Sequence, residues 1–194
     1  MGNQETKIYA FEGLDGSGKT STSRLVKSEL EAAGFSVGWR RHPNTEGIVG
    51  KTLIHGKRME ITLPKEMDRL FVYDLKRSIR SIPPGTDIML WDRYIDSVYT
   101  SNDQSVLADV LKLAEGLRLP NKTFFLELSP EFAFQRAVDL SLHALTLEWL
   151  QLKYARYQEL IQTNPERYVV IDSTQPQEIV VATILGEIRK DYER

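Results

Sequence analysis

The chain has 194 residues, 41% of them hydrophobic and 27% charged, a composition typical of a globular protein with room for one α/β domain. A net charge of −2 leaves no electrostatic footprint for nucleic acid, and the absence of cysteine excludes disulfide frameworks and thiolate metal sites. No run of 18 apolar residues occurs and no apolar run precedes the first predicted strand, so we expect no membrane span, no signal peptide and a cytoplasmic location.

The first predicted element is a glycine-rich turn between a strand and a helix. Residues 7–12 (KIYAFE) predict a short buried strand, and apolar residues recur at helical spacing after Lys19. Between them, residues 13–20 (GLDGSGKT) match G-x-x-x-x-G-K-[ST] at every fixed position. Because strand, turn and helix occur in the required order, we predict a phosphate-binding loop for a nucleoside triphosphate.

The chemistry of this loop follows from its residue types. Glycines permit positive φ and close backbone approach, so successive N–H groups can converge on phosphate oxygens. Lys19 would neutralise the β- and γ-phosphates, and the Thr20 hydroxyl would hold Mg²⁺. The predicted nucleotide-binding residues of the loop are Gly13, Asp15, Gly16, Ser17, Gly18, Lys19 and Thr20.

The rest of the chain alternates apolar runs of strand length with segments of helical periodicity. The first helix should carry Leu25, Val26, Leu30 and Ala33 on one apolar stripe and end at Gly34. Further strands are predicted at 35–39, 87–91, 122–128 and 168–172, and helices at 46–59 (weakly), 64–82, 95–117 with a break near 102–103, 130–139, 147 to before Pro165, and 176–189. This alternation predicts one parallel sheet covered by helices on both faces.

Charged residues follow two of these strands, at the sheet edge where open parallel sheets bind ligands. Arg40 and Arg41 begin a loop after the second strand, where they suit an anion, although a solvated basic turn would have the same sequence. Asp92 ends an apolar strand, so we predict that it supports Mg²⁺, the alternative being a helix cap. Arg93 presents a planar fork that matches phosphate oxygens.

Several motifs together resemble the thymidylate kinase family nearly from end to end. They are FEG (11–13) with the phosphate loop, DRY (92–94), FFLELSPE (124–131) with Arg136, and IDS (171–173) before Gln175 and Pro176. The resemblance implies a P-loop NTPase-type three-layer α/β sandwich with a parallel five-stranded sheet. It also implies ATP as phosphate donor, Mg²⁺ dependence, a deoxynucleoside monophosphate as acceptor, and a homodimer.

The resemblance assigns roles to individual residues. Arg41 and Arg93 match arginines that bind the acceptor phosphate, and Phe71 matches the aromatic ring that stacks on the base. Asp15 matches the carboxylate that faces the sugar, and Ser97 matches a polar group beside the acceptor. Arg136 matches an arginine near the triphosphate-side nucleotide, with residues 173–175 near its adenine. Simpler interpretations remain open for three of them: core packing for Phe71, an exposed helix position for Arg136, and a helix filler for Ser97.

Three positions depart from the family pattern. Leu75 stands where the family has an arginine that contacts the base, and Asn102 stands where a threonine or glutamine would touch it. Members with glycine after the loop aspartate, as Gly16 is here, place an arginine in their lid, but no arginine occurs between Arg136 and Lys153. Phosphoryl transfer needs a cation on the moving group, and the candidates are Arg136, Lys153, Arg156 and protonated His143. Our hypothesis is that Arg136 or Lys153 closes over the phosphates.

We therefore predict a single nucleoside monophosphate kinase domain over residues 1–194, with a short lid around 137–146. The predicted reaction is ATP-dependent phosphorylation of thymidylate by in-line transfer, with Lys19, Arg93 and Asp92 as catalytic residues and Thr20 with Asp92 at the metal. The alternatives are a kinase of another nucleotide or deoxynucleoside, such as deoxyuridylate, and a weakly catalytic nucleotide-binding module. Small-molecule nucleotides are the expected partners, without nucleic acid or membrane.

Overall fold

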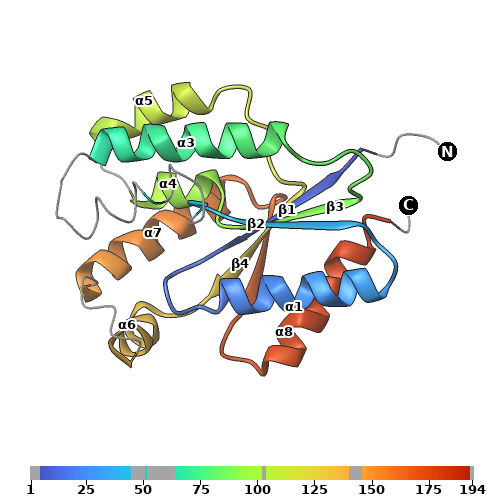
Figure 1. The fold of residues 1–194 in the computed structure, drawn as a ribbon. Helices are drawn as coiled ribbons and strands as arrows, with labels where there is room; N and C mark the ends of the chain where they lie inside the picture. The colour runs from blue at the N-terminus through green and yellow to red at the C-terminus, as the bar shows by residue number, and fades with distance from the viewer. Residues whose placement is uncertain (1–4, 45–50, 52–63, 102–103, 140–145, 193–194) are drawn as a thin grey trace.

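A five-stranded parallel sheet with helices on both faces forms the centre of the molecule (Figure 1), as seen in a computed structural model that describes residues 5–44, 51, 64–101, 104–139 and 146–192. Its strands are β1 (Lys7–Glu12), β2 (Val37–Arg41), β3 (Ile88–Asp92), β4 (Lys122–Glu127) and β5 (Tyr168–Asp172). The helices are α1 (Lys19–Ala32), α3 (Pro64–Arg80), α4 (Ile95–Ser101), α5 (Gln104–Ala114), α6 (Pro130–Asp139), α7 (Leu147–Thr163) and α8 (Gln177–Arg189). This is the predicted P-loop NTPase-type three-layer fold.

The strand order is β2-β3-β1-β4-β5, and every neighbouring pair is parallel. The three inner strands are buried on both faces, which explains why their sequences read as almost continuous apolar runs. Because β1 lies at the centre, the loop that follows it opens between the carboxyl ends of β3 and β4. The order of the strands therefore places the glycine turn in the middle of one sheet edge.

Two helical layers sandwich the sheet, and successive residues of β1 point into different layers. Tyr9 and Phe11 pack with α1 and α8, whereas Ile8 and Ala10 pack with α3 and α4 on the other face. A third cluster joins β4 to α7 through Phe125 and the partners Leu14, Leu128, Ala133, Leu150, Tyr157, Leu160 and Tyr168. Figure 1 shows α1 and α8 below the sheet, with α3, α4 and α5 above it.

Two sequence-based predictions of local structure are wrong. Arg40 and Arg41 do not begin a loop, because they pair with Trp91 and Asp92 as the last residues of β2. Leu25 and Ala33 are not on the buried stripe of α1, because Leu25 is 43% exposed and Ala33, the residue that follows the helix, is exposed as well. The buried face of α1 is instead Lys19, Thr22, Ser23, Val26 and Leu30, which follows the helical period from the phosphate loop.

Some predictions fall on residues outside the description. These are most of the weak helix at 46–59, the break at 102–103, and residues 140–145 of the predicted lid. Among the described residues, no helix is long and apolar enough to cross a membrane.

Candidate functional site

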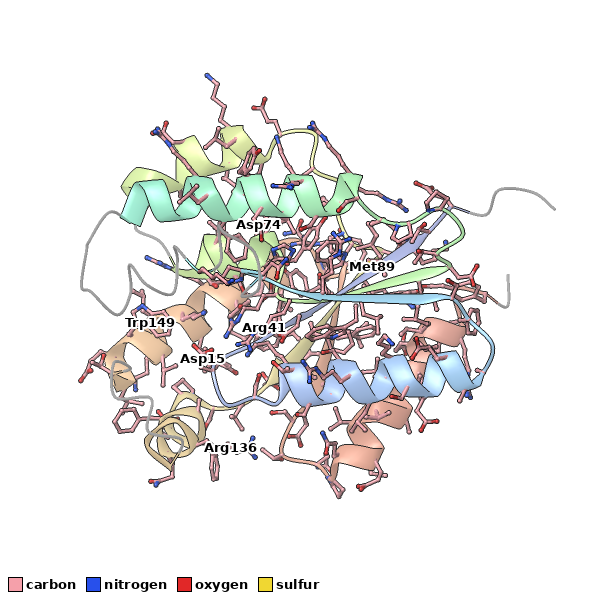
Figure 2. The ribbon with its side chains drawn as sticks, viewed as in Figure 1. Asp15, Arg41, Asp74, Met89, Arg136 and Trp149 are labelled. Carbon is pink, nitrogen blue, oxygen red and sulfur yellow. The ribbon has the colours of Figure 1, made fainter. Side chains whose placement is uncertain are left out.

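The carboxyl ends of β1, β2 and β3 bring the predicted site residues together. Phe11 of β1 pairs with Asp92 of β3, and Asp92 pairs with Arg41 of β2, so the phosphate loop starts beside the ends of β3 and β2, where Asp92 and Arg41 lie. Figure 2 shows Asp15 and Arg41 at this edge of the sheet, with Trp149 of α7 on the same side. Sequence order separates these groups by many residues, and the parallel sheet collects them.

The phosphate loop is shaped by glycines that no other residue could replace without strain. Gly13 has φ +143°, and a Cβ atom there would lie 2.6 Å from the Leu126 carbonyl oxygen and 2.8 Å from Ser17 Oγ. Gly18 has φ +86° and precedes α1, which begins without a side-chain cap. The first N–H groups of α1 therefore remain available for an anion, with the helix dipole adding positive potential.

Lys19 folds back over the loop. Its ammonium group donates hydrogen bonds to the Leu14 carbonyl oxygen at 2.6 Å and to Ser17 Oγ at 3.4 Å. Burial, reinforced by repulsion from Arg93, lowers the pKa of Lys19 to about 8, while nearby carboxylates partly offset the shift. A bound polyphosphate would supply the negative charge that restores the protonated form.

Asp92 and Thr20 meet at the position predicted for a metal. The Thr20 hydroxyl donates to Asp92 Oδ2 at 2.5 Å, and Arg41 Nε lies 3.6 Å from the same oxygen. The other oxygen, Oδ1, is buried and has no hydrogen-bond partner among the described residues. An unpartnered carboxylate oxygen beside a hydroxyl fits Mg²⁺, which binds through one or two carboxylates and completes its shell with phosphate oxygens and water.

Among the described residues, no three acidic, histidine or cysteine side chains form a cluster that could hold a metal ion by themselves. A Mg²⁺ ion bound with a nucleotide does not need a complete protein cage.

Arg93 adopts a backbone conformation that is unusual for a residue with a side chain. Its φ is +74°, and its N–H donates to the Phe11 carbonyl oxygen at 3.1 Å, just before the loop. The guanidinium group pairs with Asp15 and lies 3.4 Å from Ser97 Oγ. Burial opposes its charge, but Asp15 and other anionic neighbours raise the pKa of Arg93 above its usual value. Strain of this kind is retained at sites where the side-chain position matters.

A buried carboxylate network behind Arg93 was not predicted from the sequence. Glu12 is fully buried and accepts hydrogen bonds from Tyr94 N (2.7 Å), Ser97 N (3.2 Å), Ser97 Oγ (2.6 Å) and Tyr157 Oη (2.8 Å). Burial and the charge of Asp96 raise the pKa of Glu12. The network ties β1, α4 and α7 together next to the loop. The only indication of this network in the sequence is Glu12, a single carboxylate at the end of an apolar strand.

The remaining acceptor-side residues occupy two environments. Ser97 is buried and uses its hydroxyl to bind Glu12, so its predicted contact with the acceptor stays a prediction. Phe71 is half-buried. Its ring and the His42 ring are in a T-shaped arrangement, with their centroids 5.8 Å apart. His42 was not identified as a site residue from the sequence. Its ring stacks on the Trp91 ring, with the centroids 4.9 Å apart. Leu75 lies fully buried in the same cluster as Trp91, where it cannot provide a polar contact to a base.

The two candidate cations near the phosphates lie in different environments. Arg136 is exposed on α6 and donates to the Gly16 carbonyl oxygen at 3.0 Å. Lys153 on α7 is only 3% exposed, and its ammonium group lies 4.8 Å from the ring centroid of Trp149. Arg136 therefore contacts the phosphate loop at the surface, whereas Lys153 is buried beside Trp149 of the same helix.

Comparison with known proteins agrees with this geometry. A family model described as thymidylate kinase matches residues 11–184. Similar curated proteins include a probable thymidylate kinase of Methanosarcina mazei, 26% identical over 97% of this chain and 98% of the relative. The thymidylate kinase of Mycoplasma capricolum is 28% identical over 96% and 98%, and that of Dinoroseobacter shibae is 29% identical over 95% and 97%.

Proposed function

The chain belongs to the thymidylate kinase family, and we propose that it transfers the γ-phosphoryl group of ATP to the phosphate of thymidylate. The observation that carries this proposal is the arrangement at the sheet edge. An uncapped helix N-terminus with Lys19 follows β1, Arg93 follows the neighbouring strand β3, and Arg41 ends β2 on the other side of β3. Two anion sites at adjacent strand ends suit two phosphorylated ligands that meet end to end.

On the donor side, backbone N–H groups of the loop and Lys19 would hold the triphosphate of ATP. Ser17 and Gly18 supply part of this cradle, and Arg136 lies on the outer side of the loop against Gly16, where a nucleotide base or sugar could reach it. Thr20 and Asp92 would hold Mg²⁺, which when bound neutralises charge on the phosphates.

On the acceptor side, Arg41 and Arg93 would bind the phosphate of thymidylate. Asp15 pairs with Arg93 and would meet the sugar, while Phe71 at the edge of the cluster would stack on the base. The hydroxyl of Ser97 holds Glu12 and approaches Arg93, so it would act on the acceptor partly by positioning that arginine.

The reaction follows from this placement. An acceptor phosphate oxygen attacks the γ-phosphorus of ATP, the bond to the bridging oxygen breaks, and ADP leaves with that electron pair. Lys19 and Arg93 neutralise the charge that spreads over the transferring group. No covalent intermediate is required, because positioning and charge neutralisation supply the catalysis.

We further propose that residues 1–194 act as one domain, that 137–146 form a lid, and that the protein works as a cytoplasmic homodimer. These three statements extend the family resemblance. The lid would exclude water while the phosphoryl group moves, which prevents hydrolysis of ATP.

The test is an ADP-release assay over deoxy- and ribonucleoside monophosphates, with free deoxynucleosides included. We expect thymidylate to give the highest kcat/KM and Lys19→Ala to abolish turnover. A preference for a purine monophosphate would overturn the proposal. Equal ADP release with and without acceptor would indicate a nucleotide-binding module that lacks kinase activity.

Deoxyuridylate is the second candidate acceptor, and one observation favours it. Leu75 places an apolar core side chain where the family pattern has a base-contacting arginine, so this contact with the base would be missing here. A free deoxynucleoside is a poorer candidate, because it offers no phosphate to Arg41 or Arg93.

A further inference from the structure

We propose that Lys153 is a catalytic residue whose ammonium group contacts the transferring phosphoryl group from helix α7. The proposal rests on the proposed kinase function and adds a third cation, from a part of the chain far from the loop in sequence. Three independent features carry it: the burial of the side chain, the face of α7 from which it projects, and the charges around it.

Burial is the first feature. Lys153 is 3% exposed, and no acceptor among the described residues hydrogen-bonds its ammonium group, which instead lies over the ring face of Trp149. A buried ammonium group with only a π partner loses most of its hydration without full compensation. This arrangement destabilises the free protein, and a bound anion would offset the destabilisation by pairing with the ammonium group.

The face of α7 is the second feature. Lys153 and Tyr157 are four residues apart and therefore lie on one side of the helix. The Tyr157 hydroxyl binds Glu12, the residue immediately before Gly13 of the phosphate loop, at 2.8 Å. Trp149, one turn in the other direction, continues the same face and lies on the loop side of the sheet in Figure 2. Lys153 is thus directed toward the phosphate loop.

The surrounding charges are the third feature. Burial, followed by repulsion from Arg93 and Lys19, lowers the pKa of Lys153 to about 7, although Asp15 and Glu12 oppose the shift. Lys153 consequently lies within electrostatic range of the two cations assigned to the two phosphate groups. Three cations that repel one another, with carboxylates that already have partners, favour the binding of a multiply charged anion among them.

The alternative cation, Arg136, is less suited to this role. Arg136 is exposed and its guanidinium group donates to the Gly16 carbonyl oxygen, and its Cβ lies 3.2 Å from the position of a Cβ on Gly16. It therefore packs on the outside of the loop, whereas Lys153 lies among the groups that face both substrates. A cation placed on the moving phosphoryl group can accelerate transfer by ~10³-fold or more.

The experiment compares Lys153→Met, Lys153→Arg and the surface control Lys27→Met, whose lysine pairs with Glu31 on the exposed side of α1. For Lys153→Met we expect kcat to fall on the order of 10²–10³-fold, with the KM for thymidylate changed less than about threefold. Lys153→Arg should keep most of the turnover, because it keeps the charge. Lys27→Met should behave as wild type.

A second readout does not depend on turnover. Acetylation of Lys153 is measured by mass spectrometry as a function of pH, with and without a non-hydrolysable ATP analogue. We expect a midpoint near the neutral range in the free protein and strong protection by the analogue, while Lys27 stays unprotected. If the wild type phosphorylates no monophosphate, the proposed function fails, and this protection still decides whether Lys153 meets the triphosphate.

Two results would overturn the inference. One is normal kcat in Lys153→Met, and the other is unchanged acetylation of Lys153 with the analogue bound. Equal loss of kcat in Lys153→Met and Lys153→Arg, with protection absent, would assign the side chain a packing role only.

Discussion

Arg41 distinguishes a kinase of nucleoside monophosphates from a kinase of free nucleosides, because only an acceptor that carries a phosphate offers this arginine an anion to bind. Its guanidinium group lies near Asp92 at the carboxyl end of β2, and about half of the side chain is exposed to the site. Losing a charge-assisted hydrogen bond costs about 1.5–3 kcal/mol, so Arg41→Ala should raise the KM for thymidylate roughly 10- to 100-fold while the KM for ATP changes little. Steady-state kinetics with each substrate varied in turn measure both constants.

The matched control for this arginine is Arg69→Ala. Arg69 is exposed on α3 and only 3.9 Å from an exposed Asp109, a surface pair that contributes little. We expect wild-type KM values from it. An Arg41→Ala enzyme with unchanged KM for thymidylate would show that Arg41 does not bind the acceptor phosphate.

Lys153 also has a consequence for stability, because its charge is buried in the free protein. Its folded-state pKa of about 7 lies below the unfolded value of about 10.4, so between these pH values the unfolded chain binds more protons. The destabilisation is therefore complete below pH 7 and disappears as the pH rises toward 10.4. Lys153→Met should raise the free energy of unfolding at pH 7 by ~1–4 kcal/mol, measured by urea titration.

This gain should shrink at pH 9.5, where wild-type Lys153 is neutral in the folded state. Lys27→Met, at an exposed ion pair, should change stability little at either pH. A variant that loses activity and gains stability would identify Lys153 as a residue kept for function. Lower stability of Lys153→Met at pH 7 would contradict the argument.

The residues of the site differ in how far sequence could predict them. The phosphate loop is eight contiguous residues with required types, so spacing alone indicates it. The position of Asp92 and Arg93 at the carboxyl edge of the sheet was predictable, because both come at the end of an apolar run of strand length. Glu12 could not be understood from sequence, because its meaning depends on Tyr157, which is 145 residues away. Only the packing of α7 on the loop brings them together.

At the scale of elements, helix α7 holds two groups of the site, and its first turn is stabilised by a cap. The Thr146 hydroxyl accepts a hydrogen bond from Trp149 N at 3.2 Å. Removing an N-cap hydroxyl costs about 1 kcal/mol, so Thr146→Ala should lower stability by that amount. Hydrogen exchange should report faster opening of the first turn of α7, where Trp149 lies.

The control uses the same substitution at the other end of the same helix. Thr163 donates its hydroxyl to Glu159 O, a bond that caps no N-terminus, so Thr163→Ala should change stability by less than about 0.5 kcal/mol. If Thr146→Ala and Thr163→Ala lower the free energy of unfolding equally, the N-cap hydrogen bond of α7 does not contribute more than an ordinary helix hydroxyl.

Strands and helices were predictable from periodicity, but their ends were not. The buried parallel strands gave apolar runs, and proline and glycine bounded the helices. The end of β2 was misplaced by two residues because Arg40 and Arg41 look like a loop in sequence. They belong to the strand because pairing with β3 holds their backbone, a contact with residues about 50 positions away.

At the scale of the whole molecule, the adjacent helices α3 and α5 both carry large exposed apolar side chains. Tyr73 of α3 is 60% exposed, and Leu111 and Leu113 of α5, the helix packed against α3, are 45% and 42% exposed. Figure 1 shows these two helices side by side at the outer edge of one layer. Apolar groups of this size on adjacent helices commonly mark a surface that another protein covers.

We therefore expect the proposed homodimer to use this α3–α5 face, and sedimentation equilibrium to give twice the chain mass of 22.3 kDa. In a two-fold interface each substitution acts twice, so Tyr73→Glu would place two buried charges and weaken the dimer at least ~10-fold. Phe132→Glu, on α6 and 62% exposed, is the matched control and should leave the dimer intact. A monomeric wild type, or dissociation by Phe132→Glu alone, would remove the α3–α5 face from consideration, because in either case charge at Tyr73 would have no interface to disturb.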